Sequence, residues 1–128
     1  MTMKVEQMKT NDLKKLIQTR LKTVCSNVYF EVATKEIYPH CVFEFNSIDL
    51  DDLSRDDVIL TVDVWDKGTT TTAIDNLCDE IEALFNYANM PQDNILPTFY
   101  RINRNTVKDD DKSIRHRVLK FSIQNYER

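Results

Sequence analysis

The chain has 128 residues, of which 41% are hydrophobic and 30% charged, and its formal net charge is −4. These proportions suit a soluble folded domain and exclude an intrinsically disordered chain. The length suits a single domain, residues 1–128, better than two. No apolar run reaches the roughly 18 residues that a membrane span needs, and we expect no secretory signal, because no apolar stretch follows the first charges.

Glycine and cysteine usage excludes further classes. Gly68 is the only glycine, whereas phosphate-binding loops and nucleophile elbows need several where the backbone meets an anion or turns sharply. Cys25, Cys41 and Cys78 are odd in number and lack a CxxC spacing, which argues against a disulfide framework and a zinc site. We interpret them as small buried hydrophobes. The acidic balance disfavours non-specific binding to nucleic-acid phosphates.

The first half of the chain predicts one helix and three strands. Residues 11–25 carry apolar side chains at helical spacing, and Asn11 is a suitable N-cap. Apolar runs at 28–32 and 41–45 predict two short strands, with Tyr38 and Pro39 between them. The aspartate-rich segment 46–57 has no regular period, so we predict a solvated loop. The alternation over 58–65 is the clearest strand pattern in the sequence.

The second half predicts a helix and a hairpin. After four consecutive threonines, apolar residues at helical spacing predict a helix that has Thr71 or Thr72 as its N-cap and ends near residues 87–89. Strands follow at 99–103 and 114–124, joined by a turn at Asp109, Asp110 and Asp111. The order αβββαββ predicts an α+β fold, in which an antiparallel or mixed sheet carries two helices on one face.

No catalytic residue, metal ligand or cofactor site is predicted. Asp63 and the aspartates of 46–57 are the candidates for a two-metal nuclease site, but the predicted loop is not rigid and no basic groove accompanies it. His40 adjoins Cys41, yet neighbouring residues on a strand point to opposite faces, so the two do not form a nucleophile and its base. We interpret His116 as a partly exposed side chain at a sheet face or an interface.

The hairpin is the most basic part of the chain. Its basic and aromatic residues are Tyr100, Arg101, Arg104, Arg115, His116 and Arg117. Such interleaving suits either single-stranded nucleic acid or an acidic surface on a neighbouring subunit, and the net negative charge favours the subunit.

The acidic side of that contact would be the aspartate-rich segment. Its interface candidates are Asp51, Asp52, Asp56 and Asp57, and those of the hairpin turn are Asp109, Asp110 and Asp111. Trp65 stands just beyond the apolar face of its strand and fits the core or an interface anchor equally well; tryptophan is enriched at interfaces.

Several segments occur in a distinctive order along the chain. They are VYFEVA from Val28, the step of Tyr38 and Pro39, VDVWDK at 62–67, the threonine-rich start of the second helix, and DDDKSIRHRVLKFSIQNYER at 109–128. Together they resemble the tail-terminator, or tail-completion, proteins of long-tailed bacteriophages, over residues 12–128. The acidic insertion at 49–57 and the single glycine depart from the commoner pattern of those proteins.

The resemblance implies a non-enzymatic virion protein of the tail or neck, made in the host cytoplasm. In that family a homo-oligomer, a hexameric ring, caps the head-proximal end of the tail tube, ends tube polymerisation and provides the surface for head joining. The implied partners are the major tail tube protein and a neck protein, with DNA passing through the lumen without specific binding, and no membrane. A neck head-completion or stopper protein is the alternative within this class, and a small metal-dependent nuclease is the alternative from another.

Overall fold

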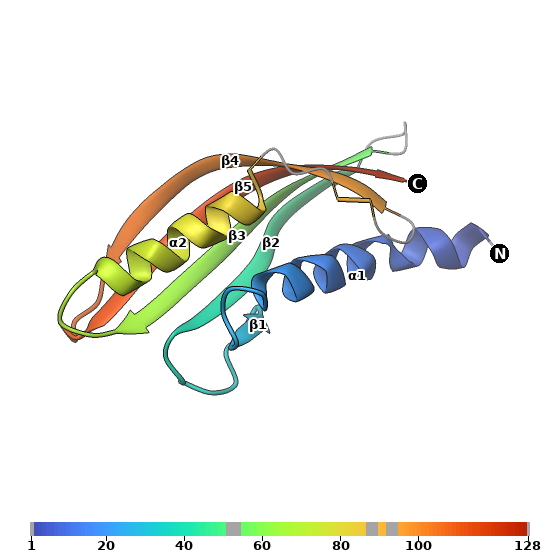
Figure 1. Cartoon of the computed structure of the whole chain (residues 1–128). Coiled ribbons are helices and arrows are strands. Elements are labelled where there is room, and N and C mark those ends of the chain that lie inside the picture. Colours follow the sequence, from blue (N-terminus) through green and yellow to red (C-terminus); the bar gives the residue numbers. More distant parts are fainter. Residues whose placement is uncertain (1, 51–54, 87–89, 92–94, 128) are drawn as a thin grey trace.

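A computed structural model describes residues 2–50, 55–86, 90–91 and 95–127 of the chain. Its elements follow the order αβββαββ (Figure 1). The helices are α1 (Thr2–Leu21) and α2 (Thr72–Leu84), and the strands are β1 (Val28–Phe30), β2 (His40–Leu50), β3 (Arg55–Lys67), β4 (Ile95–Lys108) and β5 (Ile114–Glu127). The predicted α+β fold is confirmed. Neither helix in these ranges combines the length and the hydrophobicity of a membrane-spanning segment.

The strands form one mixed sheet in the spatial order β1-β2-β3-β5-β4. β1 pairs with β2 in parallel, and the other neighbouring strands are antiparallel. β3 pairs with β5 along its whole length, from Arg55 opposite Tyr126 to Lys67 opposite Ile114. β4 and β5 form the predicted hairpin, and in its turn the Asp111 carboxylate accepts hydrogen bonds from the Ser113 hydroxyl (2.7 Å) and N–H (2.9 Å). These bonds lower the pKa of Asp111.

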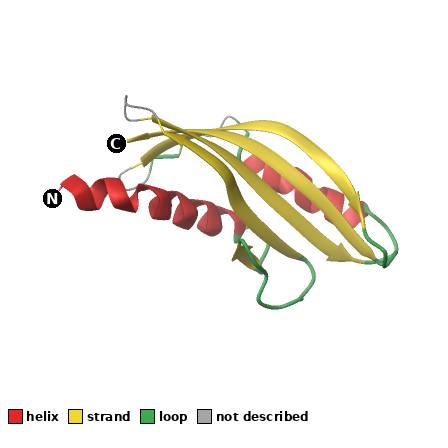
Figure 2. Ribbon diagram, turned by 180° about the vertical axis from the view of Figure 1, so that it is seen from behind, coloured by secondary structure: helices red, strands yellow, loops and turns green. Residues whose placement is uncertain are grey.

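Alternation along the strands gives the sheet one apolar face, which packs against both helices. The fully buried residues of this face include Phe43, Leu60, Val62, Phe99, Leu119 and Phe121. They share one core with helix residues at helical spacing, namely Leu13, Leu16, Ile17 and Leu21 of α1 and Ile74, Leu77, Cys78 and Ile81 of α2. In Figure 2 the molecule is seen from behind, and the strands lie in front of α2. Within the described ranges, no helix covers the opposite face of the sheet.

The aspartate-rich segment differs from its prediction as a solvated loop. β2 continues to Leu50 and β3 begins at Arg55, and residues 51–54 lie outside the described part of the chain. Pairing extends through Asp49 opposite Asp57 to Leu50 opposite Asp56, because the hydrogen bonds of a long antiparallel ladder outweigh the weak strand propensity of aspartate. Asp56 is buried, and its carboxylate pairs with the Lys9 ammonium of α1 at 2.9 Å. The described residues of this segment therefore extend the sheet and join it to α1.

The helix boundaries also differ from the predicted ones. α1 begins at Thr2, so Asn11 lies within the helix and is not its N-cap, and the helix ends at Leu21. α2 begins after Thr71, as predicted, although the Thr71 side chain makes no capping hydrogen bond. It ends at Leu84, before 87–89, because Phe85 turns into the core and its N–H donates to the Glu82 carbonyl (3.3 Å). Tertiary packing sets both ends.

The three cysteines are free and buried, as predicted. Burial raises the pKa of the Cys78 thiol to about 12, so this side chain stays protonated at neutral pH. The Cys25 thiol lies 3.6 Å from the Asn27 carbonyl oxygen, which it meets as a weak donor. His40 and Cys41 occupy opposite faces of β2, since Cys41 is in the core and His40 is not.

Candidate functional site

A row of aromatic and histidine rings crosses the helix-free face of the sheet. The Trp65 ring of β3 stacks on the His116 ring of β5, with centroids 3.6 Å apart and planes 12° apart. On the other flank of β3, the His40 ring of β2 lies 6.0 Å from Trp65 at an angle of 16°. The register causes this arrangement, because Trp65 is directly opposite both histidines. Trp65 is therefore half-buried on the sheet face and lies outside the core.

Asp63 holds the row in place. The His116 Nε2 atom lies 2.7 Å from Asp63 Oδ1, and His116 is only 8% exposed. His116 thus lies at a sheet face, as predicted, but it is more buried than expected. Among the residues that the structure describes, no three histidine, cysteine, aspartate or glutamate side chains are grouped so that they could hold a metal ion.

A hollow of about 540 Å³ opens beside the row. The connection between β1 and β2 forms one wall, and β2, β3 and the end of the hairpin form the others. Its polar and aromatic lining consists of Glu31, Glu36, Tyr38, His40, Asp63, Trp65 and Asp109. Four carboxylates from three separate segments, namely the β1–β2 connection, β3 and the hairpin turn, thus surround an aromatic floor. Such an arrangement suits a cation with an apolar stem.

Burial of His40 predicts a dependence of stability on pH. The pKa of His40 lies below its usual value of 6.5, chiefly because burial disfavours the charged imidazolium. Because the pKa of His40 is lower in the folded than in the unfolded state, the contribution of His40 to the free energy of unfolding is complete above about pH 6.5. It is lost as the pH falls through the folded-state pKa. We expect the free energy of unfolding, measured by urea titration, to fall between about pH 7.5 and 5.5, and to fall less in His40→Gln. An equal fall in both proteins would contradict this prediction.

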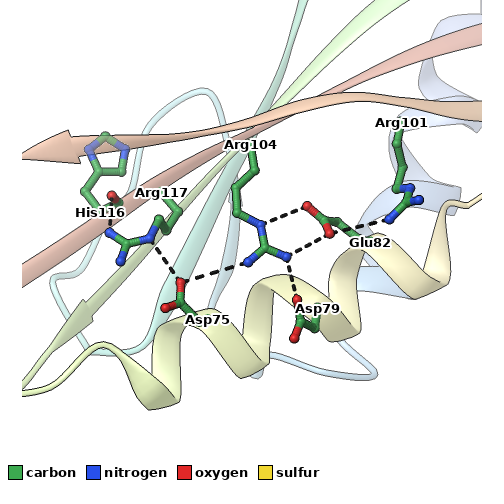
Figure 3. A network of polar contacts seen from close by, with 7 residues as sticks. All are labelled: Asp75, Asp79, Glu82, Arg101, Arg104, His116 and Arg117. Carbon is green, nitrogen blue, oxygen red and sulfur yellow. Dashed lines mark hydrogen bonds and ion pairs between the residues drawn. The ribbon is translucent and has the colours of Figure 1, made fainter.

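An arginine–carboxylate network joins the hairpin to α2 on the other side of the sheet (Figure 3). Arg104 donates from Nε and Nη2 to the two carboxylate oxygens of Glu82 (2.9 and 2.7 Å), and from Nη2 to Asp79 (2.6 Å). Arg117 donates to Asp75 at 3.1 Å, and Arg101 lies 3.7 Å from Glu82. The hydrogen bonds to Glu82 raise the pKa of Arg104, so it stays charged throughout.

The structure brings some of the predicted interface residues together and separates others. Arg104 and Arg117 meet carboxylates of their own chain, and Arg115 donates to the Thr69 carbonyl at 3.0 Å. Asp57 pairs with Arg55 (3.1 Å). The turn residues Asp109, Asp110 and Asp111 are exposed, and Asp51 and Asp52 lie outside the described residues. A contact of any of these residues with another subunit stays a prediction.

Two sets of residues at these sites were not predicted from the sequence. Asp75, Asp79 and Glu82 follow the i, i+4, i+7 spacing of one helix side, and this signal was available in the sequence. Their partners on the hairpin could not be predicted from the sequence. Arg104 faces α2 only because of the register shift in β4. The hollow joins segments far apart in the chain, so no local pattern could have predicted it.

The comparisons with known proteins find a fold neighbour. No protein-family model matches the sequence, and a search of curated proteins found no match. Among solved structures, a chain of the "Virion of native gene transfer agent (GTA) particle" is similar, with a TM-score of 0.71 and 10% sequence identity. The similarity covers 92% of this chain and 97% of that chain. At this identity it establishes that the two chains share a fold across nearly their entire lengths.

Proposed function

We propose that this protein is a structural subunit of a phage-type virion, and that it acts as the tail terminator. In this role, a ring of its copies caps the head-proximal end of the tail tube, ends polymerisation of the tube and offers a surface for joining the head. The observation that carries the proposal is the fold shared with a chain of a gene transfer agent virion, because it covers nearly all of both chains. The segments that resemble tail terminators support the finer assignment.

Many polar side chains form hydrogen bonds and ion pairs within the subunit, which supports a structural role and not a catalytic one. Asp63 holds His116, Arg104 holds Glu82 and Asp79, and Asp56 is paired with Lys9. Such contacts tie the elements of the subunit to one another, as a structural role requires. We therefore propose a non-enzymatic protein. Magnesium-dependent cleavage of DNA that disappears in Asp63→Ala would contradict this part of the proposal.

The shape of the sheet suits a subunit that contacts neighbours on more than one side. Its long central strands make a rigid support, and both its helix-free face and the outer side of α1 remain open to partners. The exposed aspartates of the hairpin turn would repel the phosphates of DNA that passes nearby. We propose that passing DNA is repelled in this way and is not bound.

Electron microscopy of particles from a phage whose copy of this gene is disrupted tests the function. We expect overlong tails without heads, because nothing would then stop polymerisation of the tube. Supplying the wild-type gene in trans should restore tails of uniform length with heads attached. Tails of normal length with heads that leak DNA would instead indicate a neck stopper, and unchanged particles would contradict a virion role.

A further inference from the structure

The outer side of α1 is strongly basic. Residues 9–30 contain five lysines or arginines and a single acidic residue, Asp12, which is buried. Lys9 pairs with Asp56, and the Lys14 ammonium lies 4.5 Å from the centroid of the Phe30 ring. Lys15 and Lys22 are exposed. Lys15 lies in α1, and Lys22 directly follows its last residue, Leu21; the Lys22 N–H donates to the Gln18 carbonyl (3.0 Å), so the helical turn continues to it. At a spacing of seven positions the two lysines lie on the same side, separated by roughly 10 Å along the helix axis. We call Lys15 and Lys22 the basic stripe.

The hollow on the helix-free face has the opposite character. Glu31, Glu36, Asp63 and Asp109 contribute carboxylates to it, and none of the described residues that line it is a lysine or an arginine. Val32, which is 69% exposed, and Tyr38 provide apolar surface next to these charges. Lysine stems pack on apolar surface while their ammonium groups reach carboxylates. The hollow therefore matches the basic stripe in both charge and apolar character.

The stripe and the hollow lie on different faces of the sheet. The helices pack against the apolar face, whereas His40, Asp63 and Trp65 in and around the hollow are on the other. Two different surfaces of one chain that complement each other produce a head-to-tail contact between copies. Head-to-tail contacts build a ring when the rotation between copies closes.

We propose that the basic stripe of one copy docks into the acidic hollow of the next copy, and that this contact builds the ring. The inference rests on the proposed function, since it assigns the surfaces that join neighbouring subunits. Complementary charge across the contact fixes which surfaces meet and in which orientation. Because the contact is built from exposed charges, raising the salt concentration should weaken it.

Charge reversal on each side separates this contact from other modes of association. The stripe variant carries Lys15→Glu and Lys22→Glu, and the hollow variant carries Glu36→Lys and Asp109→Lys. All four positions are exposed, so folding should be unaffected, and circular dichroism checks this. In sedimentation velocity we expect each variant alone to associate at least about tenfold more weakly than the wild type, because like charges then face each other.

Mixing the variants gives the decisive result. In an equimolar mixture, a wild-type stripe meets a wild-type hollow at one contact, and two reversed surfaces meet at the next, so association should return. A chain with all four substitutions should associate for the same reason. Glu80→Lys, on the exposed side of α2, is the matched control and should behave as the wild type.

Several results would overturn the inference. They are wild-type association of the stripe variant, two variants that stay apart when mixed, or a wild-type protein that remains monomeric at every concentration and salt. None of these decides the proposed function, because tail length in the gene-disrupted phage is measured independently of how the subunits pair. Normal tails in that phage would overturn the proposed function even if the charge-swapped proteins associate as expected.

Discussion

Replacing Phe85 with alanine should lower the free energy of unfolding by about 3–5 kcal/mol. Phe85 is fully buried where α2 ends, and its ring centroid lies 4.8 Å from that of Phe99 and 5.5 Å from that of Phe121. The substitution removes the apolar contacts of a whole ring and leaves a cavity between α2 and the two strands of the hairpin. A loss of this size is a large part of the roughly 5–15 kcal/mol that stabilises a small domain.

Urea unfolding followed by circular dichroism measures this loss. Phe85→Leu keeps most of the apolar volume and should cost clearly less than Phe85→Ala. Val107→Ala is the control at an exposed strand position and should change stability by no more than about 0.5 kcal/mol. If Phe85→Ala were as stable as Val107→Ala, the end of α2 could not be packed against the sheet as described.

Replacing Arg104 with alanine should cost about 2 kcal/mol, the second largest of the expected effects. The Arg104 side chain is 26% exposed and makes a two-pronged contact with Glu82, whose side chain is 18% exposed. Its removal deprives the Glu82 carboxylate of this two-pronged partner and leaves it the weaker contact with Arg101 at 3.7 Å. Because the network ties α2 to β4, the variant should also hold β4 less firmly against α2. The hairpin turn at Asp109 directly follows β4.

A double-mutant cycle with Glu82→Gln measures the contact itself. The two substitutions together should cost less than the sum of their separate effects, since each removes the partner of the other. Arg101→Ala is the matched control, because the Arg101 side chain is 50% exposed and should contribute well under about 1 kcal/mol. Strict additivity of Arg104→Ala and Glu82→Gln would show that the network does not hold the helix to the hairpin.

The sequence predicted the elements whose apolar residues repeat with a clear period. Alternation over 58–65 and 114–124 and helical spacing in 74–84 all lie inside observed elements. A period of two or of 3.6 residues survives in the fold, because it decides which side chains face the core. The two buried helix stripes and the buried sheet face, and with them the α+β class, follow from this.

Where the elements end was less predictable. Asp49, Asp56 and Asp57 have weak strand propensity, yet they continue the ladder between β2 and β3. α1 extends well before Asn11, whose side chain would have suited a cap. In both cases tertiary contacts outweigh local preference, as the pairing of Lys9 with Asp56 shows by joining the first half of α1 to the start of β3.

By itself, the sequence determined the fold class, the order of the elements and the residues that fill the core, because these depend on local periodicity. Only the tertiary structure decided which surface residues meet. The strand register stacks Trp65 between His40 and His116, and the packing of α2 brings Glu82 to Arg104. The same packing leaves the acidic hollow and the basic stripe on different faces of the sheet. Such juxtapositions join positions far apart in the chain, and no local pattern encodes them.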